Sequence, residues 1–572
     1  MRAHRLVRAA PALAGLVVGL LALGPALGRG FVLRYDMVFV PGPPLRLDPG
    51  GFPRAVPSDQ VVALLSSVLP AQAVQKLILL AIFVLAGSGA AALVPGDRLV
   101  ARLAAAVFYA WNAYLAQRLL LGQWALLLGF AGLPWAVRAA ARGGPWRLAL
   151  ALVPAAAGGF QAMLVSVLAV LPVAATRALP VPAGGSSLVV PVPVGGSSPV
   201  VTVPVAGPSR RLRGTLEALA VLAVLSLPWA VPALLSHAVT DPAGVDAFAP
   251  RADGPFGTLG SLLSLGGIWN AQAVVPGQAA WVLATARLLL AVVAVVTFVR
   301  LLRTEAPYWR GLLIAASAGL VIALAGAYAP GVLKGLIGLW PGFGPLRDGQ
   351  LYVAPLVLVQ AVGFGVAVGR LSRPDDRVRG VAVGHLPRLD DRVRGVARAD
   401  ARARRAAVLV PAVVGVLVPV LVLPTFAWGA SGRLAAVEYP DDWRRVQAIV
   451  NGDPRPGALI SLPWGAHRAF AWNGGRVILD PATKSFARRV VWDDALVVGL
   501  AAGRPLRVAG EDLLARRVGA AIGTRGGALT SVLRAAGIRY VLIVGQDENA
   551  FRSRLPGATS VYVGRQVLLL RL

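Results

Sequence analysis

The stretch AVQKLILLAIFVLAGSGAAALV, residues 73–94, decides the fold class of this chain. It carries a single charged residue, Lys76, among apolar and small side chains. A helix of this length crosses the apolar core of a bilayer, which is ~30 Å thick. The stretch therefore predicts a membrane-spanning helix.

Comparable apolar windows recur along most of the chain. They lie at about 11–28, 99–115, 119–137, 215–236, 279–302, 311–329, 351–369 and 406–428. Residues 148–176 are too long for one crossing and contain Gly158-Gly159, so we interpret them as two short helices packed together. With 57% hydrophobic and 14% charged residues, the sequence predicts an α-helical polytopic membrane protein with about eleven transmembrane helices.

The formal net charge of +30 raises the possibility of a nucleic-acid partner. Most basic residues lie between the apolar windows, however, where positive charge keeps a segment cytoplasmic. Eleven spans, starting inside, place the basic segments on the cytoplasmic side, including 370–405 with its eleven arginines and five aspartates. We therefore expect a plasma-membrane protein with a cytoplasmic N-terminus, lipid contacts and no nucleic-acid partner.

This topology divides the chain into two predicted domains. Residues 1–428 form the transmembrane domain, and 429–572 form a soluble extracytoplasmic α/β domain. In the second domain we expect helices at 443–450 and 529–536, buried strands at 458–462 and 540–544, and one or two closing strands within 561–570.

Two inside segments have low complexity. Residues 180–209 alternate Pro/Val repeats with Gly-Gly-Ser-Ser and predict a disordered cytoplasmic linker. The basic cytoplasmic loop 370–405 contains the near-duplicate DDRVRGVA at 375–382 and 390–397. This loop is compatible with a solvated connection or with contact to anionic lipid headgroups.

Several kinds of site are excluded or unsupported. The chain has no cysteine, which excludes disulfides, thiolate metal sites and cysteine nucleophiles. Its four histidines are scattered, so no histidine-based metal site is predicted. The C-terminal region carries neither a Gly-x-Ser-x-Gly elbow nor a phosphate loop with lysine.

The stretch FVLRYDMVFVPGPP, residues 31–44, places charges where a membrane surface is expected. Ionisable groups there are costly unless they are paired or functional. In an extended conformation Arg34 and Asp36 point to the same side, so they could act on one ligand. Asp36 as a general base with Arg34 as a phosphate or carboxylate contact is one hypothesis, and a local ion pair that anchors the loop is the other.

Other candidate residues lie in the predicted outer segments. Arg347 and Asp348 are either ligand contacts or an adjacent charged pair in a turn. Gln123, like Asn112, either binds hydroxyl groups or caps a broken helix. Trp269 beside Asn270 suits sugar stacking, but a tryptophan also belongs to an interfacial belt.

The arrangement resembles the GT-C glycosyltransferases. The resemblance rests on an acidic residue early in a large first outer loop, on the many spans, and on a C-terminal extracytoplasmic domain. The stretch NAYLAQRLLLGQW, residues 112–124, and PGFGPLRD, residues 341–348, resemble segments of actinobacterial arabinofuranosyltransferase-type or mannosyltransferase-like proteins. The resemblance covers most of the membrane region and is architectural more than sequence-specific.

The resemblance implies a glycosyltransferase that uses a polyprenyl-phosphate sugar donor and a cell-envelope glycan or glycolipid acceptor. Asp36 would be the catalytic base, and Arg34, Arg118 and Arg347 would hold the departing phosphate. Two alternatives stay open: a transporter or flippase of lipid-linked intermediates, and an inactive relative that acts as a glycan-binding or assembly subunit.

One departure from the family pattern concerns metal. Many GT-C enzymes carry two acidic residues close together in the first loop, whereas Met37 follows Asp36 here. A divalent cation generally needs several oxygen ligands. No cofactor is therefore predicted, and a divalent cation is not supported by the single acid.

Overall fold

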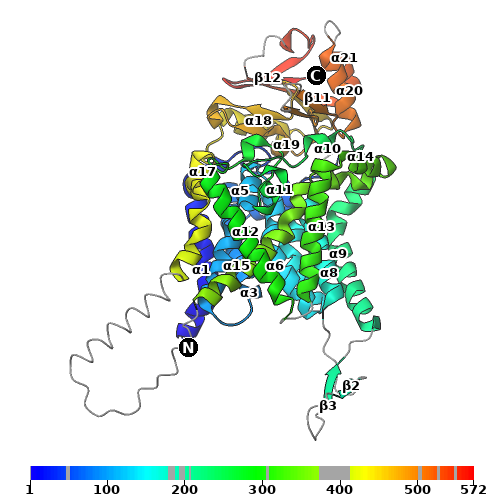
Figure 1. Ribbon diagram of the computed structural model, residues 1–572. Coiled ribbons are helices and arrows are strands. Elements are labelled where there is room, and N and C mark those ends of the chain that lie inside the picture. The colour runs from blue at the N-terminus through cyan, green and yellow to red at the C-terminus, as the bar shows by residue number, and fades with distance from the viewer. Residues whose placement is uncertain are drawn as a thin grey trace, which may run out of the picture.

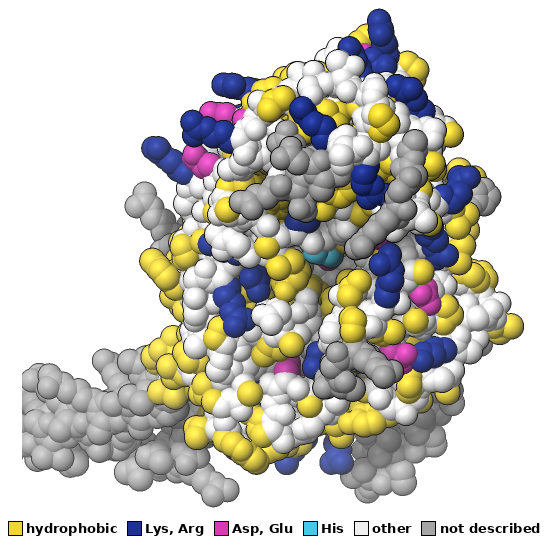
Figure 2. All heavy atoms as spheres, turned by 90° about the horizontal axis from the view of Figure 1, so that it is seen from above, with side chains coloured by type: hydrophobic (Ala, Val, Ile, Leu, Met, Phe, Trp, Pro, Cys, Tyr) yellow, Lys and Arg dark blue, Asp and Glu magenta, His cyan; other side chains and the backbone are white. Residues whose placement is uncertain are grey.

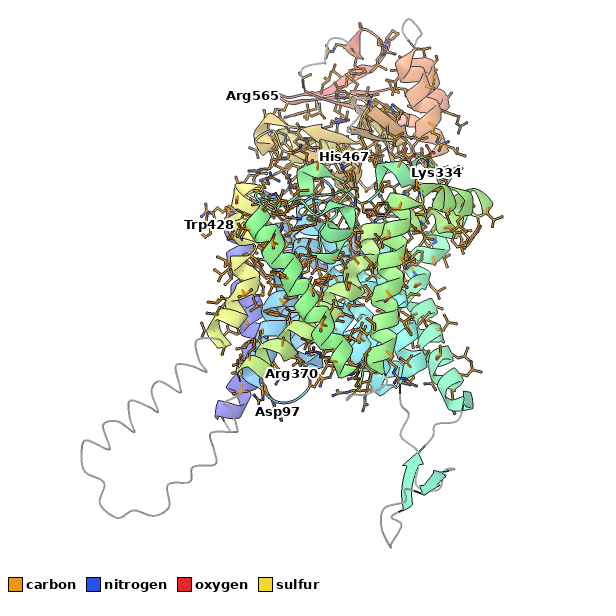
Figure 3. The ribbon with its side chains drawn as sticks, viewed as in Figure 1. Asp97, Lys334, Arg370, Trp428, His467 and Arg565 are labelled. Atoms are coloured by element: carbon orange, nitrogen blue, oxygen red, sulfur yellow. The ribbon has the colours of Figure 1, made fainter. Side chains whose placement is uncertain are left out.

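The computed structural model describes residues 2–46, 52–177, 187–191, 200–204, 208–236, 238–303, 308–372, 412–499, 505–524, 529–545 and 551–572. A bundle of long helices lies beneath a smaller α/β region, residues 436–572 (Figure 1). We call the end of the bundle that meets this region the α/β end. The N-terminus and Arg370 lie at the opposite end (Figures 1 and 3).

The bundle confirms the helical membrane fold. Eight helices in the described ranges are long and apolar enough to cross a membrane, and Ala412–Leu421 with Pro424–Gly432 forms a further candidate bent by 66°. The helices of the bundle are α1 (Arg2–Leu23), α3 (Ala71–Leu93), α4 (Leu99–Ala110), α5 (Ala113–Leu120), α6 (Trp124–Arg142), α7 (Pro145–Gly158), α8 (Phe160–Thr176), α9 (Pro208–Leu235), α12 (Trp281–Leu301), α13 (Tyr308–Tyr328) and α15 (Ala354–Leu371). Shorter elements between them are η1 (Gly24–Leu27), α2 (Ser58–Ser66), α10 (Gly244–Ala247), α11 (Gly257–Leu263), η2 (Ala271–Ala273), α14 (Pro330–Leu339), η3 (Pro341–Arg347), η4 (Gly349–Val353), η6 (Pro424–Phe426) and α17 (Ala427–Gly432).

The pair of helices predicted within 148–176 is present as α7 and α8. Gly159 separates the two helices. Its φ is +75°, and a Cβ there would lie 2.4 Å from the carbonyl oxygen of Val56, in the loop before α2. At the other end of α8, Arg177 Nη1 donates to the carbonyl of Ala140, near the end of α6. The chain therefore runs along the bundle through α7 and returns through α8, although both are shorter than the eight long candidates.

The structure differs in part from the disordered linker that was predicted for residues 180–209. Strands β2 (Ser187–Pro191) and β3 (Val200–Pro204) pair antiparallel, because each is rich in β-branched valine and a Gly-Gly-Ser-Ser turn sequence separates them. The remaining linker residues lie outside the described chain as far as Pro208, where α9 begins. Most of the predicted basic loop, from 373 to 405, also lies outside it, as does the start of the window 406–428.

The α/β region contains a five-stranded sheet in the order β12-β13-β11-β5-β8. Strands β11, β5 and β8 run parallel, whereas β13 is antiparallel to both β11 and β12. Helices α20 and α21 pack on one face of this sheet, and α18 packs on the other. The elements are β4 (Ala436–Val437), α18 (Asp441–Gly452), β5 (Ala458–Leu462), β6 (His467–Ala469), η7 (Ala471–Asn473), β7 (Val477–Leu479), α19 (Ala482–Ser485), β8 (Val490–Val491), β9 (Leu496–Gly499), β10 (Pro505–Val508), α20 (Leu513–Gly523), α21 (Leu529–Ala535), β11 (Ile538–Val544), β12 (Thr559–Val563) and β13 (Val567–Arg571).

The first loop joins the bundle to the α/β region. Strand β1 (Phe31–Val32) pairs antiparallel with β4. On its other side, the side chain of Gln75 in α3 accepts from the amide of Val32 at 2.9 Å and donates to its carbonyl at 2.8 Å. Gln75 is fully buried, so these two bonds take the place of hydrogen bonds to water for the N–H and C=O groups of Val32.

Small residues set the closest helix contacts in the bundle. A Cβ added to Gly363 in α15 would lie 1.9 Å from the carbonyl oxygen of Ala294 in α12. A Cβ added to Gly319 in α13 would lie 2.0 Å from the carbonyl oxygen of Tyr352. Without a hydrophobic driving force between helices in lipid, such close backbone packing is what holds them together.

We expect Gly363→Ala to destabilise the bundle by about 1–3 kcal/mol, because the added methyl group forces α15 away from α12. Gly335→Ala in α14 is the matched control, since a Cβ there meets no atom within 4 Å. Thermal unfolding of both variants in detergent, followed by tryptophan fluorescence, checks this. Equal melting temperatures for the two variants would contradict it.

Candidate functional site

A cavity of about 1220 Å³, the central cavity, lies between the helical bundle and the α/β region. Its charged and titratable wall residues include Asp36, Arg54, Arg251, Arg347, His467 and Glu511. Aromatic residues, among them Phe52, Phe160 and Trp229, form another part of the wall. Figure 3 labels His467 at the junction of the two regions, and Figure 2, from above, shows a histidine in a hollow among Lys and Arg side chains.

Asp36 lies in a tight turn, residues 34–37, and not in an extended strand. The amide of Arg34 donates to the carbonyl of Met37 at 3.2 Å, and the amide of Met37 donates back at 2.9 Å. Tyr35 has a φ of +44°, in the left-handed region. The predicted extended conformation is therefore wrong, because a turn of this kind breaks the alternation of side chains.

The turn separates Arg34 from Asp36. Arg34 Nε donates to the carbonyl of Leu120 at 3.0 Å, and its Nη2 donates to the carbonyl of Gln272 at 2.9 Å. Arg34 is not on the wall of the central cavity, whereas Asp36 is. Arg34 thus ties the loop to α5 and η2, and the local ion pair with Asp36, one of the two hypotheses for this stretch, is not formed.

Close approach of the α5–α6 connection holds the turn in place. The amide of Asp36 donates to the carbonyl of Leu121 at 3.2 Å. The next residue, Gly122, has a φ of +83°, and a Cβ there would lie 2.2 Å from the amide nitrogen of Met37. Only glycine fits at this position, for both reasons.

The neighbour of the Asp36 carboxylate comes from the α/β region. His467 Nε2, at the start of β6, lies 3.4 Å from Asp36 Oδ1, and the two side chains are 26% and 48% exposed. The ring of Tyr35 meets His467 edge-on at 6.1 Å. No local pattern predicts this pair, because 431 residues separate its members.

Arg118 and Asp348 form a buried ion pair. Two guanidinium nitrogens of Arg118 donate to the two carboxylate oxygens of Asp348 at 2.7 and 2.9 Å. Arg118 also donates to Gln123 Oε1 at 2.6 Å. The side chain of Arg118 is fully buried and does not line the cavity, whereas Gln123 and Asp348 do. Asn112, the other residue weighed as a cap, accepts from the amide of Leu115 and caps α5.

Arg347 pairs with the α/β region and not with its neighbour Asp348. Glu511 accepts from Arg347 at 2.9 Å through Oε1 and from Arg54 at 2.8 Å through Oε2. Burial alone would raise the pKa of Glu511, but the charges and hydrogen bonds of Arg54 and Arg347 outweigh it and lower the pKa to about 2. Glu511 is therefore a carboxylate at neutral pH.

The loop between α9 and α12 supplies further wall residues. Trp269 is buried against Phe248, with ring centroids 4.9 Å apart, so it does not belong to a lipid-facing belt. The side chain of Asn270 caps η2 by accepting from the amide of Gln272. Arg251 also lines the cavity, and no carboxylate in the described chain pairs with it. Arg251 was not predicted as a site residue, because it belongs to no recognisable motif.

The side chains around Asp36 do not assemble a cluster of metal ligands. Within the described ranges no group of three or more His, Cys, Asp or Glu side chains is arranged to hold a metal ion. The arrangement suits proton transfer at Asp36 and anion binding by the arginines.

Comparisons with known proteins identify no family. No protein-family model and no curated protein sequence matches the chain. Similar solved structures include arabinofuranosyltransferase AftD from Mycobacteria, with a TM-score of 0.48 and 15% identity. Two classes of an AftD mutant give TM-scores of 0.46 and 0.48, also at 15% identity. The matches cover 99% of this chain and 39–41% of the AftD chains, so this chain spans about two fifths of their length.

We expect Asp348→Asn to destabilise the protein by about 3–5 kcal/mol, because it leaves the charge of Arg118 buried without a partner. Asp246→Asn is the matched control, since it removes the partner of Lys334 in a pair whose side chains are 38% and 39% exposed. That loss is expected to stay below about 1 kcal/mol. Thermal unfolding in detergent measures both, and a loss in Asp348→Asn as small as in the control would rule out a structural role for the pair.

Proposed function

We propose that this protein is a membrane glycosyltransferase that transfers a sugar from a polyprenyl-phosphate donor to a hydroxyl group of a cell-envelope glycan or glycolipid. The observation that carries the proposal is the half-exposed carboxylate of Asp36 on the wall of a cavity that is part aromatic and part cationic. Such a wall suits a ligand with an apolar chain, a phosphate and a sugar.

The reaction assigned to Asp36 is general base catalysis. Its carboxylate accepts the proton of the acceptor hydroxyl as that oxygen bonds to the anomeric carbon of the sugar. The bond from the anomeric carbon to the phosphate oxygen breaks, and polyprenyl phosphate leaves with the electron pair. No redox partner is required.

The aromatic wall supports an apolar donor. Phe160 lies edge-on to Phe52 and to Trp229, with ring centroids 5.2 Å apart in each pair. Trp229 belongs to α9, whose apolar window is only 11% buried. A ligand in this part of the cavity is therefore next to a helix that exposes apolar residues to lipid.

The arginines on the cavity wall are proposed to bind the phosphate. Arg347 was expected in this role, and we add Arg54 and Arg251, the second of which has no carboxylate partner in the described chain. The resemblance also suggested Arg34 and Arg118. Arg34 donates to backbone carbonyl groups and Arg118 pairs with Asp348, so we propose no phosphate contact for either. Gln123, Trp269, Asn270 and Asp348 are proposed as wall contacts to the donor or acceptor.

We assign His467 to the positioning of Asp36. A hydrogen bond from Nε2 to Asp36 Oδ1 orients the carboxylate and leaves its other oxygen for the acceptor hydroxyl. The distance of 3.4 Å is long for such a bond and leaves room for it to shorten when substrate binds.

The proposed location is the plasma membrane, with the α/β region and the cavity on the outer face. In support, Arg370 lies at the end of the bundle opposite His467 (Figure 3), and α6, α12 and α15 each carry an arginine in their last turn. The domain division near residue 428 is part of the same proposal.

We expect Asp36→Asn to lower sugar transfer by about 10²–10⁴-fold, because the amide cannot accept the proton. The measurement is transfer by purified protein in liposomes that contain a polyprenyl-phosphate sugar. Asp59→Asn is the control from helix α2 on the wall of the same cavity, where the carboxylate pairs with Lys484. Undiminished transfer by a folded Asp36→Asn protein would remove Asp36 as the base.

We expect His467→Ala to lower kcat by about tenfold with little change in KM, since the carboxylate loses its orientation while the substrate contacts remain. His467→Gln keeps an N–H donor and should recover most of the rate. Steady-state kinetics on the three proteins check this. If glutamine is as poor as alanine, the hydrogen bond to Asp36 is not what matters.

A further inference from the structure

Glu511 occupies a site that has the features of a phosphate site. Arg54 and Arg347 each donate to a different oxygen of its carboxylate, at 2.8 and 2.9 Å. Two guanidinium groups that converge on separate oxygens of one anion are also the arrangement that binds phosphate. The two guanidinium charges face the single carboxylate charge of Glu511.

The two arginines and the glutamate belong to different parts of the molecule. Arg54 comes from the first loop and Arg347 from η3, both on the bundle side of the central cavity, whereas Glu511 comes from the α/β region. The amide of Glu511 donates to Asp494 at 2.6 Å, and this bond fixes the segment that carries the carboxylate. The arginines can therefore bind another anion only if Glu511 moves aside.

Exposure indicates which group is free to exchange partners. The side chain of Glu511 is 7% exposed and that of Arg347 is 16% exposed, but Arg54 is 52% exposed. A ligand in the cavity meets Arg54 first. A phosphate monoester such as the leaving polyprenyl phosphate carries up to about two negative charges and three acceptor oxygens, so it competes with a carboxylate for two guanidinium groups.

We propose that Arg54 and Arg347 form a phosphate-binding site that Glu511 occupies when no ligand is bound, so that phosphate binding displaces Glu511. This deepens the proposed function, on which it rests for the identity of the phosphate as that of the donor lipid. Glu511 then acts as an internal competitor that keeps phosphate affinity low and favours release of the leaving phosphate.

The test is phosphate binding by the full chain in detergent, measured by calorimetry with inorganic phosphate and with farnesyl phosphate as probes. Glu511→Gln removes the competing charge and is expected to tighten phosphate binding by on the order of tenfold. Asp453→Asn is the matched control, because it removes a carboxylate that pairs with Arg539 and does not line the cavity. Unchanged or weaker binding in Glu511→Gln would overturn the proposal.

A second variant keeps the test decisive if Glu511→Gln does not fold. Arg54→Gln changes a half-exposed residue and is expected to weaken phosphate binding at least several-fold; unchanged affinity would overturn the proposal. Stronger binding of farnesyl phosphate than of inorganic phosphate identifies a lipid source, and equal binding identifies free phosphate. Because neither probe requires turnover, phosphate binding that responds to both variants in a protein without transferase activity would refute only the proposed function.

Discussion

The structure depends on how the backbone of the first loop is paired as it passes between the bundle and the α/β region. A buried peptide group without a partner costs free energy comparable to a lost hydrogen bond. Gln75 pairs both groups of Val32, the amide of Tyr35 donates to Val477 at 2.8 Å, and the amide of Asp36 donates to Leu121. These partners belong to α3, β7 and the α5–α6 connection. The loop therefore fixes three segments against one another and sets Asp36 where they meet.

Pairing also decides which charges on the cavity wall a ligand can use. Arg118 and Asp348 pair with each other, so neither charge is available to a ligand, although Asp348 also lines the cavity. Arg347 shares Glu511 with Arg54, and Arg251 has no carboxylate partner in the described chain. A residue type that suits phosphate is thus a weaker guide to function than the partner it has in the fold.

Features set by local sequence were predictable, and features set by distant contacts were not. Eight of the nine long apolar windows, the break at Gly158-Gly159 and the strands 458–462 and 540–544 follow from short-range composition and periodicity, and the described chain has them. The conformation of residues 34–37 was predicted wrongly, because long-range pairing with Val477 and Leu121 forms a turn that local alternation does not indicate. The contact between His467 and Asp36 was not predicted for the same reason, since it forms only after the two regions pack.

The α/β region and the bundle together form the proposed site. The region supplies His467 to the carboxylate of Asp36 and Glu511 to the cavity arginines, and β4 pairs with the loop that carries Asp36. Without it, the turn at 34–37 would lose the partner of its Tyr35 amide, and the cavity would open to solvent on one side. Water would then weaken each electrostatic contact proposed between the arginines and phosphate, because charge interactions fall as the local dielectric constant rises. The region is therefore required for the chemistry proposed for Asp36 as well as for its geometry.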